Sequence, residues 1–178
     1  MLISEPYREQ QSYMHENTVY GVAAARYAPL VAATMNRLMV SELLDYGCGS
    51  RLTLAKSLSD ARLVDHAFKY HPYDPAVSLH SREPEPCEMV ACIDVLEHIE
   101  PELLPNVLDD LKRLVKRIGF FTVSCVPAVK TLPDGRNAHL IQAPPDWWLP
   151  KIMSRFELHT FQVTDDGFIV LVASKDEE

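Results

Sequence analysis

The residues with the clearest chemical potential fall in three short segments, and the first of them is a glycine turn. Asp45 is followed by YGCGS at positions 46–50. Glycines here let the backbone turn sharply and come close to a ligand, because they carry no Cβ. A tight turn that binds nothing has the same pattern, so the segment alone does not establish a site. A dinucleotide site would carry a third glycine at the position of Leu52, which disfavours a nicotinamide-dependent dehydrogenase.

The second segment is Asp74, which precedes Pro75 and follows a predicted strand over about 67–73. A carboxylate at the end of such a strand can accept two hydrogen bonds from the 2′- and 3′-hydroxyls of a ribose. An Asp-Pro turn without a ligand is the alternative, because this pair is common in turns. The glycine turn that precedes Asp74 favours the ribose-binding interpretation.

The third segment is CIDVLEHIE at positions 92–100. Glu97 and His98 follow Asp94 by three and four residues, a spacing that would place the three side chains on one side of a helical turn. They could then converge on one pocket. In the alternative, Asp94 caps the helix and His98 is a packed structural residue.

The hydrophobic pattern around these segments alternates between strands and helices. The predicted strands cover residues 41–45, 67–73, 89–93, 119–126, 157–164 and 168–173, and the predicted helices cover 18–40, 52–58, 101–118 and 146–156. This order predicts a mostly parallel sheet with helices on both faces. Asp-Asp-Gly at 165–167, between two apolar runs, predicts a terminal antiparallel hairpin.

Specific residues predict how these helices begin and end. The helix over 18–40 contains Pro29, so we expect it to be bent or broken there. The helix over 101–118 should begin at Pro101 and stop at Gly119, which suit a first helical position and a C-terminal cap. Residues 1–16 are polar and weakly patterned, and we expect a mobile arm or a cap over a site.

The three acidic residues share one position in this scheme. Asp45, Asp74 and Asp94 each fall at the end of a predicted strand. Ligands of open parallel sheets bind at the carboxyl ends of the strands. The chain therefore predicts a binding site where these carboxylates meet.

The order of the motifs resembles a class I S-adenosylmethionine-dependent methyltransferase. The resemblance is carried by LLDYGCGS, YDPAV and CIDVLEHI and covers residues 40–173. It implies an α/β, Rossmann-like fold with a seven-stranded sheet in the order 3-2-1-4-5-7-6, and S-adenosylmethionine as the cofactor. The residues that it implies for cofactor binding are Asp45, Gly47, Cys48, Gly49, Asp74, Asp94 and Leu96.

Within this set the resemblance implies separate roles. The turn glycines would underlie the methionine and ribose portions of the cofactor, and Asp74 would hold the ribose hydroxyls. Asp94 would edge the methyl-transfer pocket, which Leu96 or nearby backbone would line.

The chain departs from the family between Asp74 and Met89, where only 14 residues lie. The family places a helix, a strand and the adenine-contacting loop there. Pro84 and Pro86 are hostile to a helix. We therefore expect the helix after the second strand to be lost and the family's third strand to be shortened or absent, which leaves the adenine contact unassigned.

The polar loop over 127–145 is predicted to face the methyl acceptor, as it does in the family. Its candidate substrate contacts are Arg136 and Asn137, together with Glu97, and its candidate base is His139. A solvated surface loop is the alternative. The catalytic residues are thus expected among His139, His98 and Asp94, because a histidine near its ordinary pKa can take a proton from an oxygen or nitrogen acceptor.

Asp94-x-x-Glu97-His98, with His139 downstream, is also similar to the E-x-x-E-H…H metal site of small-RNA 3′-end 2′-O-methyltransferases. A divalent cation could lower the pKa of a hydroxyl there. Relatives without a metal carry the same DVLEHI segment, so the metal stays an open question.

The composition bears on the binding partners and the cellular location of the protein. The 178 residues carry a formal net charge of −8, which disfavours duplex nucleic acid as a partner. The four cysteines form no C-x-x-C pair, the start MLISEPYREQ has no signal-peptide pattern, and the apolar run over 20–40 is interrupted by Arg26. We expect a cytoplasmic protein with reduced cysteines and no membrane span.

The sequence thus predicts one domain over 1–178, with residues 1–40 as a helical cap and 41–178 as the cofactor-binding core. Its predicted function is methyl transfer to an oxygen or nitrogen of a small molecule. The alternative is a module that binds S-adenosylmethionine or S-adenosylhomocysteine and transfers nothing. Metal-assisted 2′-O-methylation of an RNA end is a less favoured alternative than either. The sequence does not indicate an oligomeric state.

Overall fold

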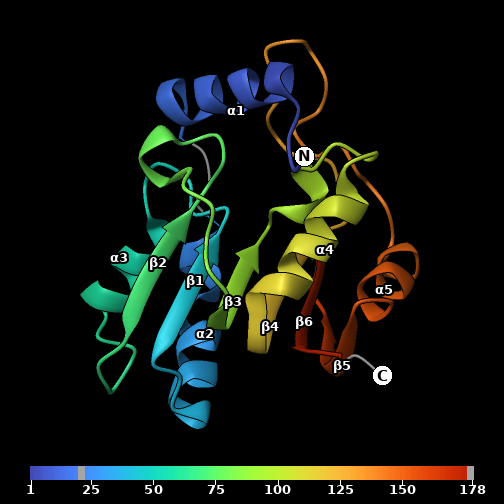
Figure 1. Ribbon diagram of the computed structural model, residues 1–178. Coiled ribbons are helices and arrows are strands. Elements are labelled where there is room, and N and C mark those ends of the chain that lie inside the picture. The colour runs from blue at the N-terminus through green and yellow to red at the C-terminus, as the bar shows by residue number, and fades with distance from the viewer. Residues whose placement is uncertain (20–22, 176–178) are drawn as a thin grey trace.

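The computed structural model describes residues 1–19 and 23–175 (Figure 1). The helices are α1 Glu5–Asn17, α2 Ala24–Leu38, α3 Thr53–Asp60, α4 Leu104–Leu114 and α5 Pro145–Met153, with the short 3-10 helices η1 Ser78–His80 and η2 Leu96–His98. The strands are β1 Glu42–Tyr46, β2 Lys69–Tyr73, β3 Cys87–Ile93, β4 Val115–Ser124, β5 Phe156–Val163 and β6 Gly167–Ser174.

The strands form one six-stranded sheet in the order β2-β1-β3-β4-β6-β5. The first four are parallel, and β6 runs antiparallel to both β4 and β5. The predicted parallel sheet with a terminal antiparallel hairpin is confirmed. The order is that of the expected seven-stranded sheet without its outermost strand beside β2.

The stretch between β2 and β3 explains the missing strand. Residues 74–86 contain only η1, and 81–86 form no regular element. Proline at 84 and 86 removes backbone donors and restricts the preceding residues, which prevents a helix there. The expected loss of the helix and strand after Asp74 is confirmed.

Helices cover both faces of the sheet because side chains along each strand alternate between them. Leu108 of α4 and Trp148 of α5 pack with Val90 on one face. Val31 of α2 and Leu54 of α3 pack on the opposite face. Figure 1 shows α4 and α2 on these two faces, with α1 lying across the carboxyl ends of the strands.

The predicted cap over residues 1–40 is therefore divided. α1 is a cap, and its Tyr7 and Met14 pack on Leu132 and Ala138 of the loop after β4. α2 instead belongs to the core, because its apolar face is buried against the sheet. α2 continues through Pro29, so of the two predicted outcomes, a bend or a break, the break does not occur. Residues 20–22 of the predicted helix lie outside the described part. None of the described helices combines the length and the apolar character that a membrane span requires.

The boundary between α4 and β4 also differs from the prediction. α4 ends at Leu114 and β4 begins at Val115, so Gly119 lies inside a strand and does not stop a helix. Val115 and Ile118 belong to β4, and both side chains are buried. Their apolar character fits both helical and strand periodicity, which is why the sequence pattern extended the helix too far.

Candidate functional site

The carboxyl ends of β1, β2 and β3 surround a cavity of about 330 Å³. Asp45, Asp74 and Asp94 all line it, so the structure brings together the carboxylates that the sequence placed at strand ends. Tyr7 and His15 of α1 line the same cavity from the opposite side. The site is thus a pocket between the ends of the strands and the helical cap.

The glycine turn after β1 is held against β2. The N–H of Gly47 donates to the carbonyl oxygen of Tyr73 at 2.7 Å. Gly47 and Gly49 have φ angles of +82° and +61°, in the left-handed region that favours glycine. A Cβ on Gly47 would collide with the side chain of Val95, and one on Gly49 would lie 3.3 Å from the His15 ring. The contact with Val95 therefore disfavours any Cβ at position 47 even without a ligand, whereas at position 49 the positive φ is the main reason for glycine.

Asp74, directly after β2, links this turn to the cavity. Its carboxylate accepts hydrogen bonds from the N–H groups of Gly49 at 3.0 Å and Ala76 at 2.9 Å. Nε2 of His15 lies 3.5 Å from the same carboxylate, and burial lowers the pKa of His15 against the attraction of Asp74. A carboxylate has about four acceptor positions. Asp74 can therefore hold the turn and still accept donors from a ligand.

Asp45 lies within β1, one residue before its end, and is buried. Burial raises the pKa of Asp45 to about 7, against the opposing effect of a hydrogen bond from the Tyr70 hydroxyl. The nearby Asp74 carboxylate adds to the increase. One wall of the cavity therefore carries a carboxyl group whose charge changes near neutral pH.

Asp94 follows β3 in a left-handed backbone conformation with φ of +50°. Its N–H donates to the Thr122 hydroxyl oxygen at 2.9 Å, and that hydroxyl donates to Oδ1 of Asp94 at 2.5 Å. Burial raises the pKa of Asp94, which the Thr122 hydrogen bond opposes. The turn after it is η2, a 3-10 helix, in place of the first turn of an α-helix.

Glu97, His98 and His139 form a cluster beside the cavity. Each offers one possible ligand atom, and these atoms lie within 4.8 Å of one another. The two imidazole rings meet edge to face with centroids 4.7 Å apart, and both histidines line the cavity. Burial and the neighbouring His139 lower the pKa of His98 to about 3. His98 is therefore a neutral imidazole at physiological pH.

The hydrogen bonds of this cluster fit a metal ion. Nδ1 of His98 lies 2.7 Å from the Ala138 carbonyl oxygen and Nδ1 of His139 lies 2.6 Å from that of Val126. Each Nδ1 must therefore carry the proton, which assigns the lone pair to Nε2, as in many metal-binding histidines. Glu97 is fully buried, its Oε1 accepts from the N–H of Ser124, and its Oε2 has no hydrogen-bond partner within the described residues. Burial raises the pKa of Glu97 well above its usual value.

The cap is tied to both sides of the cavity. The Tyr7 hydroxyl donates to the His98 carbonyl oxygen at 2.5 Å. The Ser12 hydroxyl donates to the Ala76 carbonyl oxygen at 2.7 Å. α1 thus spans from the segment after β2 to the segment after β3 and roofs the site.

The predicted substrate contacts in the loop after β4 have other partners. Arg136 is exposed, pairs with Asp134 at 2.8 Å and lies over the Tyr7 ring. Asn137 fixes the loop, since its side chain accepts from the N–H of Ala128 and donates to the carbonyl oxygen of the same residue. Neither is among the described residues that line the cavity, so the loop contributes His139 and not these two side chains. Glu97, the third predicted substrate contact, is fully buried and does not line the cavity either.

Of two further residues predicted to contact the cofactor, Cys48 lines the cavity and Leu96 does not. The Leu96 side chain is buried in the core, and Val95 takes the place on the cavity wall that was expected for it. Cys48 lines the cavity as expected for a turn residue, and burial raises the pKa of its thiol. Cys48 is therefore a neutral thiol.

The sequence pattern did not single out the contribution of α1. Tyr7, Gln11 and His15 line the cavity from one face of this helix. Their spacing of four residues was a helical signal. It was missed because the polar character of residues 1–16 obscured the pattern.

Comparisons with known proteins bear on this arrangement at the level of the fold. No protein-family model and no curated protein sequence matches the chain. Among solved structures, that of TnmH matches with a TM-score of 0.59 and 15% identity, covering 93% of this chain and 57% of TnmH. The chain therefore spans just over half the length of that protein.

Two further structures are those of named methyltransferases. The 1,6-didemethyltoxoflavin-N1-methyltransferase of Burkholderia thailandensis, solved with its substrate and S-adenosylhomocysteine, matches with a TM-score of 0.60 and 15% identity over 87% of this chain and 80% of its own. The magnesium protoporphyrin IX methyltransferase of Synechocystis PCC 6803, solved with S-adenosylmethionine, matches with a TM-score of 0.59 and 16% identity over 95% and 94%.

These likenesses establish the architecture. The chain has the Rossmann-like fold of the class I S-adenosylmethionine-dependent methyltransferases, with the strand beside β2 missing. The resemblance drawn from the motifs is thereby confirmed for the fold.

Proposed function

We propose that the protein is an S-adenosylmethionine-dependent methyltransferase that acts on an oxygen or nitrogen atom of a small molecule. The observation that carries this proposal is the cavity at the carboxyl ends of β1 to β3. It combines a glycine turn, a carboxylate after β2 and a histidine from the loop after β4, His139. Solved structures with this fold contain S-adenosylmethionine or S-adenosylhomocysteine, which supports the cofactor.

The residues of the cavity fit the parts of such a cofactor. Asp74 has the position and the acceptor capacity to bind the ribose hydroxyls while it holds Gly49. Asp45 can offset the positive charge of the cofactor, because its pKa of about 7 allows a cation to draw it into the carboxylate form. When bound, the cofactor supplies a methyl group that is already activated by its sulfonium. The protein then has to position the acceptor and remove its proton.

His98 is poorly suited to that proton transfer, which leaves His139 as the candidate base. A base is most effective when its pKa lies near the operating pH. The lowered pKa of His98, about 3, makes it a weak base, and its ring packs against His139. His98 therefore positions the His139 ring, and the Val126 carbonyl oxygen holds the tautomer of His139 that leaves Nε2 able to accept a proton.

A cofactor-binding module without transferase activity is the rival to this proposal. The two differ in what happens after the cofactor binds. Calorimetry with S-adenosylmethionine and S-adenosylhomocysteine, followed by a screen for transfer of a labelled methyl group to phenols, carboxylic acids and amines, separates them. Binding together with turnover of one acceptor class supports the enzyme. Binding without turnover of any of them supports the module.

A pair of variants shows whether cofactor binding depends on the cavity. Asp74→Asn keeps the size of the side chain and removes its charge, so we expect weaker cofactor binding. Asp60→Asn is the matched control, because Asp60 is exposed on α3 and does not line the cavity. Equal cofactor affinity in the two variants would contradict the role given to Asp74.

Metal-assisted transfer to a hydroxyl group is the second candidate function. It is favoured by the Glu97–His98–His139 cluster, in which a buried carboxylate oxygen has no hydrogen-bond partner within the described residues. A divalent cation on these three residues would lower the pKa of a bound hydroxyl. The 2′-hydroxyl of an RNA end is the acceptor implied by the resemblance to small-RNA methyltransferases, although the net charge of −8 disfavours a long RNA contact.

Removal of metal tests this second candidate. We expect a chelator to lower both the transfer rate and the melting temperature if the cluster holds a cation. Re-addition of Mg²⁺, Mn²⁺ or Zn²⁺ in turn would identify the ion. Unchanged activity and unchanged melting temperature after chelation would exclude metal-assisted transfer.

A further inference from the structure

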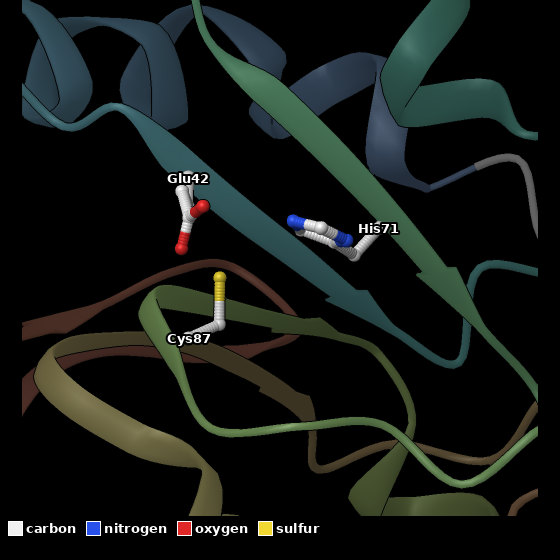
Figure 2. Close-up of side chains that lie close together, drawn as sticks. All are labelled: Glu42, His71 and Cys87. Carbon is white, nitrogen blue, oxygen red and sulfur yellow. The ribbon is translucent and has the colours of Figure 1, made fainter.

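Three potential metal ligands converge at a second place in the fold, away from the cavity. Glu42 is the first residue of β1, His71 lies in the middle of β2, and Cys87 is the first residue of β3. One ligand atom from each lies within 4.8 Å of the others. Figure 2 shows the three side chains pointing toward one another across the adjacent strands.

The register of the sheet produces this convergence. Leu44 pairs with His71 in the parallel ladder between β1 and β2, so His71 lies on the same face as Leu44 and Glu42. Cys87 pairs with Val115 of β4, and both residues belong to the core cluster that contains Leu44. The thiol thus shares the face of Leu44, with which it packs in the same core cluster.

Among the described residues, no α-helix connects β2 to β3, although a parallel sheet normally has helices on both faces. The chain between β2 and β3 forms no α-helix, and residues 81–86 return to β3 as an extended segment (Figure 1). Cys87 is buried, Glu42 is half-buried and His71 is exposed. The three ligands therefore form a site that solvent ions can reach, with the thiol at its inner end.

The donor set selects the class of metal. Thiolate, imidazole and carboxylate are the ligands that Zn²⁺ takes in proteins, whereas Mg²⁺ and Ca²⁺ prefer oxygen ligands alone. Tetrahedral zinc requires donor atoms roughly 3.5 Å apart. The exposed His71 and the half-buried Glu42 can turn to close that gap without moving Cys87. Glu42 now pairs with the exposed Lys69 at 3.3 Å, a contact that a zinc ion would readily displace.

We propose that Glu42, His71 and Cys87 form a zinc site, with water as the fourth ligand, that ties β2, β1 and β3 together where the helix is missing. The ion would stabilise this end of the sheet by linking residues from three strands. The proposal is independent of the proposed function, because Glu42 and Cys87 lie at the amino ends of their strands and the cavity lies at the carboxyl ends.

Cobalt substitution tests this site and separates it from the Glu97–His98–His139 cluster. A Co²⁺ ion bound to a thiolate gives a sulfur-to-metal charge-transfer absorption, which a cluster of carboxylate and imidazoles cannot give. We expect the full-length protein, stripped with a chelator and titrated with Co²⁺, to develop this band with one equivalent. Zn²⁺ should abolish the band by displacement and should raise the melting temperature.

Variants locate the band on these residues. Cys87→Ser should remove it, while Cys125→Ser, at the other end of the sheet, should leave it unchanged. His71→Ala and Glu42→Gln change residues that are not fully buried, so they test the site even if Cys87→Ser fails to fold. Each should weaken zinc binding by roughly 100-fold or more, since loss of an outer partner of a ligand alone costs roughly 10- to 100-fold.

The outcomes that would overturn the proposal are equally specific. They are the absence of a charge-transfer band in the wild-type protein, a band that persists in Cys87→Ser, or unchanged zinc affinity in both His71→Ala and Glu42→Gln. A rise in melting temperature that depends on His139 and not on His71 would assign the metal to the other cluster and would equally overturn it.

Discussion

Replacement of Asp45 by asparagine should change how the stability of the protein depends on pH. Asn at this position keeps the size of the side chain and an oxygen acceptor for the Tyr70 hydroxyl, but it cannot ionise. Burial raises the pKa of Asp45 from the ordinary value of 3.8 to about 7. Between these two values the folded chain holds a proton that the unfolded chain has released, so wild-type stability falls as the pH rises.

The size of the effect follows from the two pKa values. The difference is 7 − 3.8 = 3.2 units. At 1.36 kcal/mol for each unit, this corresponds to about 4 kcal/mol of wild-type stability lost between pH 3.8 and pH 7, with little further change above pH 7. The Asn variant does not suffer this loss. We therefore expect the stability of Asp45→Asn relative to wild type to increase by about 4 kcal/mol across this range.

Urea denaturation of both proteins at a series of pH values between about 4 and 8 measures this difference directly. Subtraction removes the contributions of all other titrating groups, which the two proteins share. Asp60→Asn is the matched control, because it makes the same chemical change at an exposed residue of α3 that does not line the cavity. A flat difference for Asp45→Asn, or one that decreases with pH, would refute the account of this carboxyl group.

Three further substitutions test single residues of the site. His139→Ala should slow methyl transfer about 100-fold or more, since a general base acts on the transfer step. The affinity for S-adenosylhomocysteine, measured by calorimetry, should stay nearly unchanged. An equal loss of affinity would show that His139 does not act on the acceptor. Asp74→Asn should weaken cofactor binding roughly 10- to 100-fold, the effect of losing hydrogen bonds to a charged acceptor; unchanged affinity would place the ribose elsewhere. Gly47→Ala should cost about 1–3 kcal/mol of stability in urea denaturation, because its φ is positive and its Cβ would meet Val95; wild-type stability would show that Val95 yields freely.

Much of the fold could be predicted from the sequence because several local residue patterns indicated the same elements. The terminal hairpin followed from Asp-Asp-Gly between two apolar runs, and β6 does begin at Gly167. Pro84 and Pro86 correctly predicted the loss of a helix after Asp74. The cavity was predictable because strand-end acids converge in any parallel sheet.

Other features depend on contacts that no local pattern reports. Val115 and Ile118 suit either a helix or a strand, so the end of α4 was decided by the sheet and not by the residues. Arg136 and Asn137 are polar loop residues, and polarity does not indicate whether a loop side chain faces the cavity or solvent. His71 and Cys87 are far apart in sequence, and only strand register brings them together.

The most direct test of the central claim is a crystal structure of the protein grown with S-adenosylhomocysteine. We expect the ligand in the cavity at the ends of β1 to β3, with its ribose hydroxyls within hydrogen-bonding distance of the Asp74 carboxylate and its amino-acid portion over the turn at Gly47. A cavity that stays empty at saturating ligand concentration, or a ligand bound away from Asp74, would contradict it.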